Sequence, residues 1–242
     1  MGKPLDTAIV GDIVATDFRA AGVFEQFGID FCCGGRMSLA DACRAATVNP
    51  SDVIGALDAL PPADERDENA GEWEVDQLLD HIVGVHHTYV REALPLIAGY
   101  LARLVSVHGA RHPELATVAE WFDQAAAGLM QHMLKEERVL FPYISELGSR
   151  QAACGRRPSP FGSVENPIRM MEREHRDAAD ELRMIRELTA NYSTPADGCT
   201  TYAVCMAELK RFEDDLHRHV HLENNVLFPR AVRLESALGL RE

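Results

Sequence analysis

Apolar residues recur at intervals of three and four along the C-terminal two thirds of the chain, the pattern of amphipathic helices. The pattern predicts four long helices, over residues 73–107, 112–146, 165–192 and 199–236. Their connections are short, so we expect a bundle with up-down-up-down topology. Pro95 should end or kink the first helix, and Pro142 and Pro229 should distort the second and fourth at the same relative place.

The N-terminal part of the chain contains shorter apolar runs, which predict a small helical domain over residues 1–62. One helix is expected over residues 17–27, and Ser38 and Ser51 are expected to cap two more. Between the first two lies the hexapeptide 30–35, Asp-Phe-Cys-Cys-Gly-Gly, whose glycines indicate a tight turn.

Two polar segments divide the rest of the chain. Residues 61–72 begin with two prolines and are predicted to link the small domain to a second domain over residues 73–242. Residues 148–163 are predicted to form a surface loop inside that second domain. No segment alternates like a strand, so the expected fold class is all-α.

The chain contains an internal repeat, in residues 132–142 and 219–229. Each copy begins with His, has Glu four positions later and ends in Val-Leu-Phe-Pro. Residues four apart project from one side of a helix, so each His and its Glu share the apolar side. The pairs are His132 with Glu136 and His219 with Glu223.

A further histidine lies on the apolar side of the helix before each copy. His86 precedes His132 by 46 residues, and His175 precedes His219 by 44. Six ionisable side chains are therefore expected in the core of the bundle, where unpaired charges cost several kcal/mol or more. Two metal ions would stabilise them, and imidazole with carboxylate suits iron or manganese better than structural zinc.

The donor count predicts an open site. Four histidines and two bridging glutamates fill eight of the about 12 positions of two octahedral metals, and an oxo or hydroxo bridge fills two more. A single histidine on an apolar helix side is more often a core residue. A duplication without metal, however, gives no reason to keep both His-x-x-x-Glu pairs. Solvation or outer hydrogen bonding is the expected role of the other histidines, His81, His87, His108, His112, His217 and His221. Glu174 either lines the site or is solvated.

Composition narrows the classes of partner. The 242 residues carry a formal net charge of −14, which opposes binding to nucleic acid or an anionic membrane. No apolar run is long enough for a membrane span and no leader precedes the helices, so a cytoplasmic location is expected. Six cysteines are too few for a disulfide scaffold. Cys32 and Cys33 are either a reactive thiol pair or two buried small residues beside a turn.

These motifs together resemble the bacterial iron–sulfur cluster repair di-iron proteins, which join a vicinal-cysteine domain to a hemerythrin-like four-helix bundle. The resemblance rests on residues 30–35, 79–86, 132–137, 171–175 and 219–229. By position it implies a non-haem centre of two iron ions with carboxylate and oxo or hydroxo bridges. The implied terminal ligands are His86, His132, His175 and His219, and the implied bridging carboxylates are Glu136 and Glu223. The resemblance also implies that Cys32 and Cys33 are catalytic residues.

The resemblance also implies a role in restoring iron–sulfur clusters damaged by nitric oxide or peroxide. One hypothesis is donation of iron to damaged or apo iron–sulfur proteins. A second is reduction of NO at the diferrous site, and a third is a sensor that binds O₂ or NO reversibly. The cysteine pair would serve redox chemistry, partner contact or dimerisation, and a homodimer through the N-terminal domain is expected.

Overall fold

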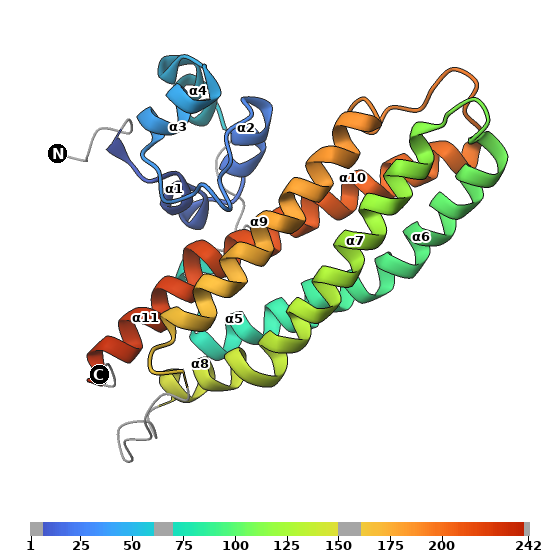
Figure 1. The fold of residues 1–242 in the computed structure, drawn as a ribbon. Helices are drawn as coiled ribbons and strands as arrows, with labels where there is room; N and C mark the ends of the chain where they lie inside the picture. Colours follow the sequence, from blue (N-terminus) through green and yellow to red (C-terminus); the bar gives the residue numbers. More distant parts are fainter. Residues whose placement is uncertain (1–6, 61–69, 150–160, 240–242) are drawn as a thin grey trace.

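The computed structural model describes residues 7–60, 70–149 and 161–239, and it confirms the all-α prediction (Figure 1). Within these ranges there is no strand, and one isolated antiparallel bridge pairs Ile9 with Ser38. The N-terminal unit contains α1 (Val10–Thr16), α2 (Ala20–Gln26), α3 (Leu39–Ala46) and α4 (Pro50–Asp58). None of the helices in the described ranges has the length and apolar character needed to cross a bilayer.

Four long helical rods follow, after a short 3₁₀ turn, η2 (Ala70–Glu72). The first rod is α5 (Val75–His81), η3 (Ile82–His87) and α6 (Thr88–His108), and the second is α7 (Glu114–Lys135), η4 (Glu136–Leu140) and α8 (Phe141–Gly148). The third is α9 (Glu165–Leu188), and the fourth is α10 (Thr200–His221), η6 (Leu222–Leu227) and α11 (Phe228–Ala237). The segments η3, η4 and η6 are π-helical.

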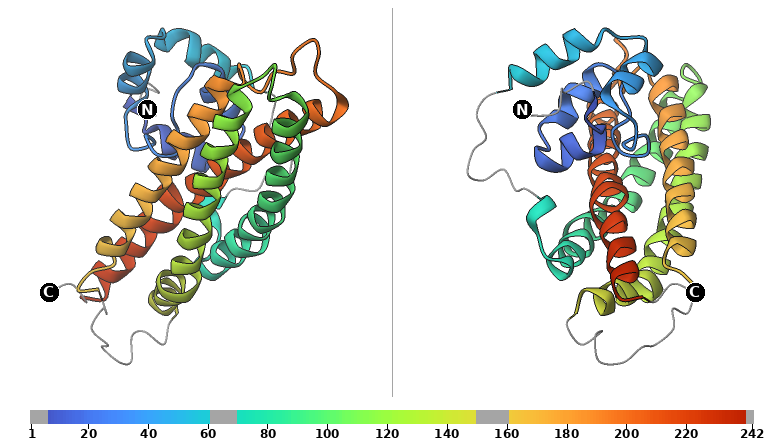
Figure 2. Two further views of the ribbon diagram at one scale, coloured as in Figure 1. Left: turned by 45° about the vertical axis from the view of Figure 1, so that its right-hand side comes forward. Right: turned by 90° about the vertical axis from the view of Figure 1, so that its left-hand side faces the viewer.

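The rods form the predicted up-down-up-down bundle. The turn between α6 and α7 and the turn between α9 and α10 lie at the same end of the bundle, so neighbouring rods run antiparallel (Figures 1 and 2). Helix α7 packs between α6 and α9, and α10 packs on α6. Apolar side chains from all four rods fill the interior, among them Leu104, Phe122, Leu182 and Phe212.

Prolines shape the rods differently in different places. Pro142 and Pro229 lie in the first turns of α8 and α11, directly after the π-helical segments η4 and η6, so the predicted distortions are confirmed. The first turn tolerates proline because its N–H groups have no partner within the helix. Helix α6 instead continues through Pro95, so the expected helix end there is wrong. Burial of Leu94 and Ile97 beside it stabilises the helix despite the missing hydrogen bond.

The N-terminal predictions are partly confirmed. Ser38 caps α3, since its hydroxyl accepts a hydrogen bond from the Asp41 N–H at 3.2 Å. Helix α4, however, begins at Pro50, and its cap is Asn49, two residues before Ser51. The single helix expected over 17–27 is in fact preceded by α1 and starts at Ala20. The carboxylate of Asp17 accepts from the N–H of Arg19 at 3.0 Å, and this local turn separates the two helices.

The predicted linker and loop lie largely outside the described residues, which omit 61–69 and 150–160. The N-terminal unit itself packs on the bundle (Figure 2). One hydrophobic cluster joins Phe24 and Leu39 to Leu209 and Phe212, and α1 contacts η6. The cysteine-bearing turn therefore lies against the last rod.

Candidate metal centre

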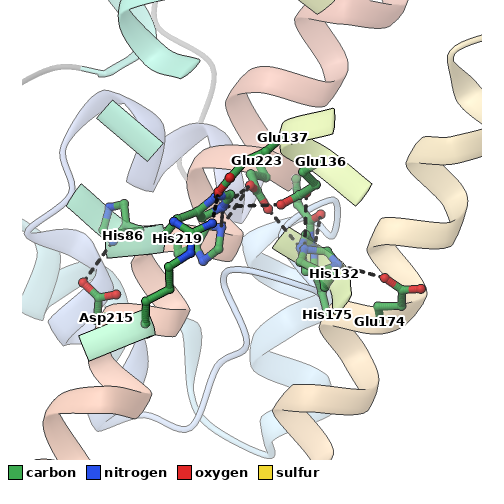
Figure 3. Close-up of polar contacts among 12 residues, drawn as sticks. His86, His132, Glu136, Glu137, Glu174, His175, Asp215, His219 and Glu223 are labelled. Carbon is green, nitrogen blue, oxygen red and sulfur yellow. Dashed lines mark hydrogen bonds and ion pairs between the residues drawn. The ribbon is translucent and has the colours of Figure 1, made fainter. Parts of the chain in front are cut away.

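Four histidines and two glutamates meet in the buried middle of the bundle (Figure 3). Every rod contributes, and each of the six residues is at most 1% exposed. Their ligand atoms form two groups, and within each group all lie within 4.8 Å of one another. The first group is His87, Glu136, His219 and Glu223, and the second is His132, Glu136, His175 and Glu223. Both glutamates belong to both groups.

Each carboxylate directs one oxygen toward each group. Glu136 places Oε1 3.2 Å from His132 Nε2 and Oε2 3.4 Å from His87 Nε2. Glu223 places Oε2 2.9 Å from His175 Nε2 and Oε1 3.0 Å from His219 Nε2. This is the arrangement that a carboxylate needs to bridge two cations.

The imidazole nitrogens converge as well. His132 Nε2 lies 2.9 Å from His175 Nε2, and His87 Nε2 lies 3.2 Å from His219 Nε2. Three of the four rings have an acceptor at the outward nitrogen, which leaves the Nε2 lone pair of the neutral ring pointing inward. The outward contacts are His87 Nδ1 to Glu137 (2.7 Å), His132 Nδ1 to Glu174 (2.9 Å) and His175 Nδ1 to Asn224 (3.0 Å).

These donors fit metal ions. Both oxygens of Glu136 and Oε2 of Glu223 are buried and accept no well-directed hydrogen bond. Lone pairs and carboxylates that face one another in an apolar core require positive charge, from protons or from metal ions. Nitrogen and oxygen donors without thiolate suit iron or manganese. The described residues therefore offer two adjacent sets of four ligand atoms.

One predicted residue lies outside the cluster. His86 belongs to neither group: its Nδ1 lies 2.9 Å from Asp215, and its ring stacks on His219 with centroids 5.7 Å apart. His87, expected to be a solvated or outer residue, takes that place. Both histidines are buried, but the π-helical η3 lets the residue five positions after Ile82, rather than four, face the ligand groups. The sequence contains a signal for this, because His87 precedes His132 by 45 residues, closer to the 44 of the other pair.

Comparison with known proteins identifies the family of this chain. Residues 78–231 match the family model described as hemerythrin HHE cation binding domain, and residues 6–61 match ScdA_N, a domain of unknown function (DUF542). A protein of Musicola paradisiaca named iron-sulfur cluster repair protein YtfE is 34% identical over 230 residues, 94% of this chain and 97% of its own length. The chain belongs to the iron–sulfur cluster repair family.

Two further members of that family are similar over most of the chain. A probable iron-sulfur cluster repair protein of Haemophilus influenzae is 32% identical over 216 residues, 88% of this chain and 91% of the relative. The iron-sulfur cluster repair protein ScdA of Staphylococcus haemolyticus is 30% identical over 221 residues, 91% and 96% of the two chains. The buried cluster thus lies in the part of the chain that matches the hemerythrin domain.

The close packing of histidines and glutamates in the cluster sets their pKa values in the metal-free bundle. Burial opposes the charge on Glu223, but His219 and His175 outweigh it and hold the pKa of this carboxyl well below its ordinary value. Burial and the Glu223 charge likewise oppose ionisation of Glu136, and His132 reverses this and lowers its pKa. Burial lowers the pKa of His132, yet Glu136 raises it to about 10. A metal ion bound at His132 would therefore displace a proton from this imidazole.

Cations stabilise two of the outward acceptors. Glu174 accepts hydrogen bonds from His132 and from Lys135. These contacts, the one with His132 above all, lower the pKa of Glu174 to about 2. Glu137 accepts from His87 and from Arg91. Glu174 therefore lies beside the cluster behind His132, the first of the two positions considered for it. Its ionised carboxylate orients the His132 imidazole and raises the basicity of the ring.

Cys32 and Cys33 lie beside the bundle but belong to neither ligand group. Cys32 is buried and Cys33 is partly exposed. The Asp30 carboxylate accepts from the N–H groups of Cys32 and Cys33, at 3.0 and 2.9 Å, and from the Cys32 thiol at 3.3 Å. Contact with the Cys33 thiol, then burial, raises the pKa of Cys32 well above its ordinary value. Cys32 is therefore a protonated thiol at neutral pH.

Proposed function

We propose that this chain binds two iron ions in the hemerythrin bundle and donates iron to damaged or apo iron–sulfur proteins. The observation that carries the proposal is that Glu136 and Glu223 are each shared by two groups of histidines. The proposed ligands are His87, His132, Glu136, His175, His219 and Glu223. Relatives at 30–34% identity carry the name iron–sulfur cluster repair protein, which supports the choice of process.

The ligand set supports release of metal. Four imidazole nitrogens and four carboxylate oxygens fill eight of about 12 octahedral positions. Bound iron would supply redox chemistry and open positions for small ligands such as NO or O₂. The open positions also favour transfer, because a client ligand can enter before the resident ligands leave.

The surrounding residues prepare the site. Glu137, Glu174 and Asn224 fix the orientation of three imidazoles. Phe141 stacks on His87 and Phe228 stacks on His175, with centroids 5.7 and 6.1 Å apart. These apolar rings limit the access of water to the carboxylates, which strengthens their attraction for cations.

We further propose that residues 1–62 and 73–242 act as a cysteine-bearing unit and a metal-bearing unit. Cys32 and Cys33 would contact the client protein or exchange thiols with it, and a homodimer through the N-terminal unit stays a prediction. NO reduction is the second candidate function, favoured by the adjacency of two ligand groups that share both glutamates.

Iron donation is tested with a purified [4Fe–4S] hydratase inactivated by peroxide or an NO donor. Iron-loaded chain should restore hydratase activity faster than free ferrous iron at equal concentration, and the His87→Ala variant should not. Equal rates for free iron and loaded chain would reject donation. Formation of N₂O from the reduced, loaded chain and NO, measured by gas chromatography, would instead support the second function.

A further inference from the structure

Two consecutive asparagines connect the cysteine turn to the metal cluster. Asn224 and Asn225 directly follow Glu223 in η6. The Asn224 carbonyl oxygen lies 3.0 Å from His175 Nδ1, and its amide nitrogen lies 3.5 Å from the Cys32 carbonyl oxygen. One buried side chain thus touches a metal-facing imidazole and the backbone of Cys32.

Asn225 fixes the same turn more firmly. Its amide nitrogen donates to the carbonyl oxygens of Phe31 and Cys32, at 3.1 and 3.2 Å. The backbone at Gly11 and Gly35 approaches so closely that an added Cβ at either position would lie 2.5 Å from the Asn225 oxygen. The two glycines therefore permit a contact that a larger residue would prevent.

Hydrogen bonds restrain the backbone and the thiol of Cys32. Its N–H and thiol point to Asp30, and its carbonyl oxygen points to the asparagine pair. A cleft of about 440 Å³ opens beside it, lined by Asp30, Phe31 and Cys32 from the N-terminal unit and by α9 and α10 residues such as Arg183 and His217. A molecule in the cleft can therefore reach the turn beside Cys32, whose carbonyl oxygen Asn224 and Asn225 bind.

We infer that Asn224 and Asn225 are positioning residues that transmit the chemical state of the Cys32–Cys33 pair to His175. A change at the two thiols moves the Cys32 carbonyl, the asparagine amides follow, and the acceptor behind His175 shifts. Loss of such an outer partner weakens metal binding about 10–100-fold in other sites. The inference rests on the proposed function only in requiring that the bundle binds metal.

The test uses the full chain loaded with ferrous iron and phenylarsine oxide, a reagent for vicinal dithiols. Two S–As bonds form, and the two thiol protons leave with the oxygen of the reagent as water, with no change of oxidation state. The readout is the rate at which iron passes to a chelator, followed by absorbance. The arsenical should change this rate at least about five-fold. Dimercaptopropanol should reverse the change, and the Cys32→Ser/Cys33→Ser chain should not respond.

Asn224→Asp and Asn225→Asp separate transmission from folding. An aspartate at 224 keeps an acceptor for His175 but has no N–H for the Cys32 carbonyl, and one at 225 loses both donors to the turn. In the double variant the ratio of rates with and without arsenical should fall below about two-fold. Asn166→Ala removes a comparable hydrogen bond, to the Phe161 carbonyl at 2.7 Å, and should keep the full response.

The outcomes are distinct. The inference would be overturned if the arsenical did not change the rate of iron transfer from the wild-type chain, or if the double variant responded fully to the arsenical. Neither result would contradict iron binding. A chain that binds no iron would refute the proposed function instead, since the initial iron content is measured before the reagent is added.

Discussion

Glu223 lies between two histidines from different rods, with one carboxylate oxygen 2.9 Å from His175 Nε2 and the other 3.0 Å from His219 Nε2. His219 is one helical turn before Glu223 on the same rod, whereas His175 comes from α9. The sequence repeat therefore accounts for one contact, and bundle packing supplies the other. A carboxylate in this position joins two ligand groups into one site.

Loss of that carboxylate should break the pairing. In Glu223→Gln the side chain keeps its volume but loses a negative charge and one bridging oxygen, so we expect at most one iron per chain. Iron affinity should fall by at least about ten-fold. Plasma mass spectrometry after anaerobic loading measures the content, and Glu187→Gln on the exposed side of α9 is the matched control. Two irons in Glu223→Gln would show that the carboxylate does not bridge.

Replacement of the adjacent histidines His86 and His87 should affect iron content differently. His87→Ala removes a ring from the cluster and should lower the iron content, because the hole it leaves is in the first ligand group. His86→Ala should retain both metals, since it loses the contact with Asp215 and the stacking on His219 but no ligand atom of either group. Iron content and the visible spectrum of the two variants, prepared in parallel, decide between them. The opposite result would return the ligand role to His86.

Stability of the metal-free chain should fall at alkaline pH. The pKa of His132 is raised to about 10, so its ion pair with Glu136 stabilises the fold below the unfolded pKa of ~6.5 and is lost as pH rises toward about 10. Glu223 has a lowered pKa, so its contribution is present above ~4.3 and is lost only in acid.

Thermal unfolding of the chelator-treated chain measures this. Its melting temperature should be highest between about pH 4.5 and 6.5 and should decline by several degrees toward pH 9. His132→Ala should flatten the alkaline decline. Iron affinity should change in the opposite sense and increase with pH, because binding displaces the His132 proton. A wild-type melting temperature that rises from pH 6.5 to 9 would be incompatible with the ion pair.

The cysteine pair should matter for repair rather than for metal binding. Cys32→Ser/Cys33→Ser should retain the iron content and visible absorbance, because neither sulfur is in the ligand groups, and should lose most of the hydratase reactivation. Cys199→Ser is the control, since Cys199 is exposed and its hydrogen bond with His108 lowers its pKa to about 7. Loss of iron in the double serine variant would show that the bundle alone does not account for the site.

The repeat made most of the cluster predictable. Spacing of four places each His with its Glu on one helix side, and the structure brings five of the six predicted residues together; their role as ligands stays a prediction. His86 lies outside the two ligand groups because a π-helical turn shifts the facing position by one residue, and a periodicity of 3.6 does not anticipate this.

The hydrogen bonds to the outward nitrogens of the histidines could not be predicted from the sequence. Glu137 and Asp215 bind histidines 50 and 129 residues away, so their roles depend on which rods become neighbours. The docking of the cysteine turn on Asn225 depends likewise on Gly11 and Gly35, which are far from it in the chain. Such contacts come from packing, for which a single sequence contains no periodic signal.

The most direct test of the paired site is the iron content of the full chain after anaerobic loading with ferrous iron and removal of the excess. Measured by plasma mass spectrometry against quantitative amino-acid analysis, it should be about two irons per chain, because two groups of four ligand atoms share Glu136 and Glu223. A content of one or none would contradict the account, since a shared carboxylate then has no second metal to bind.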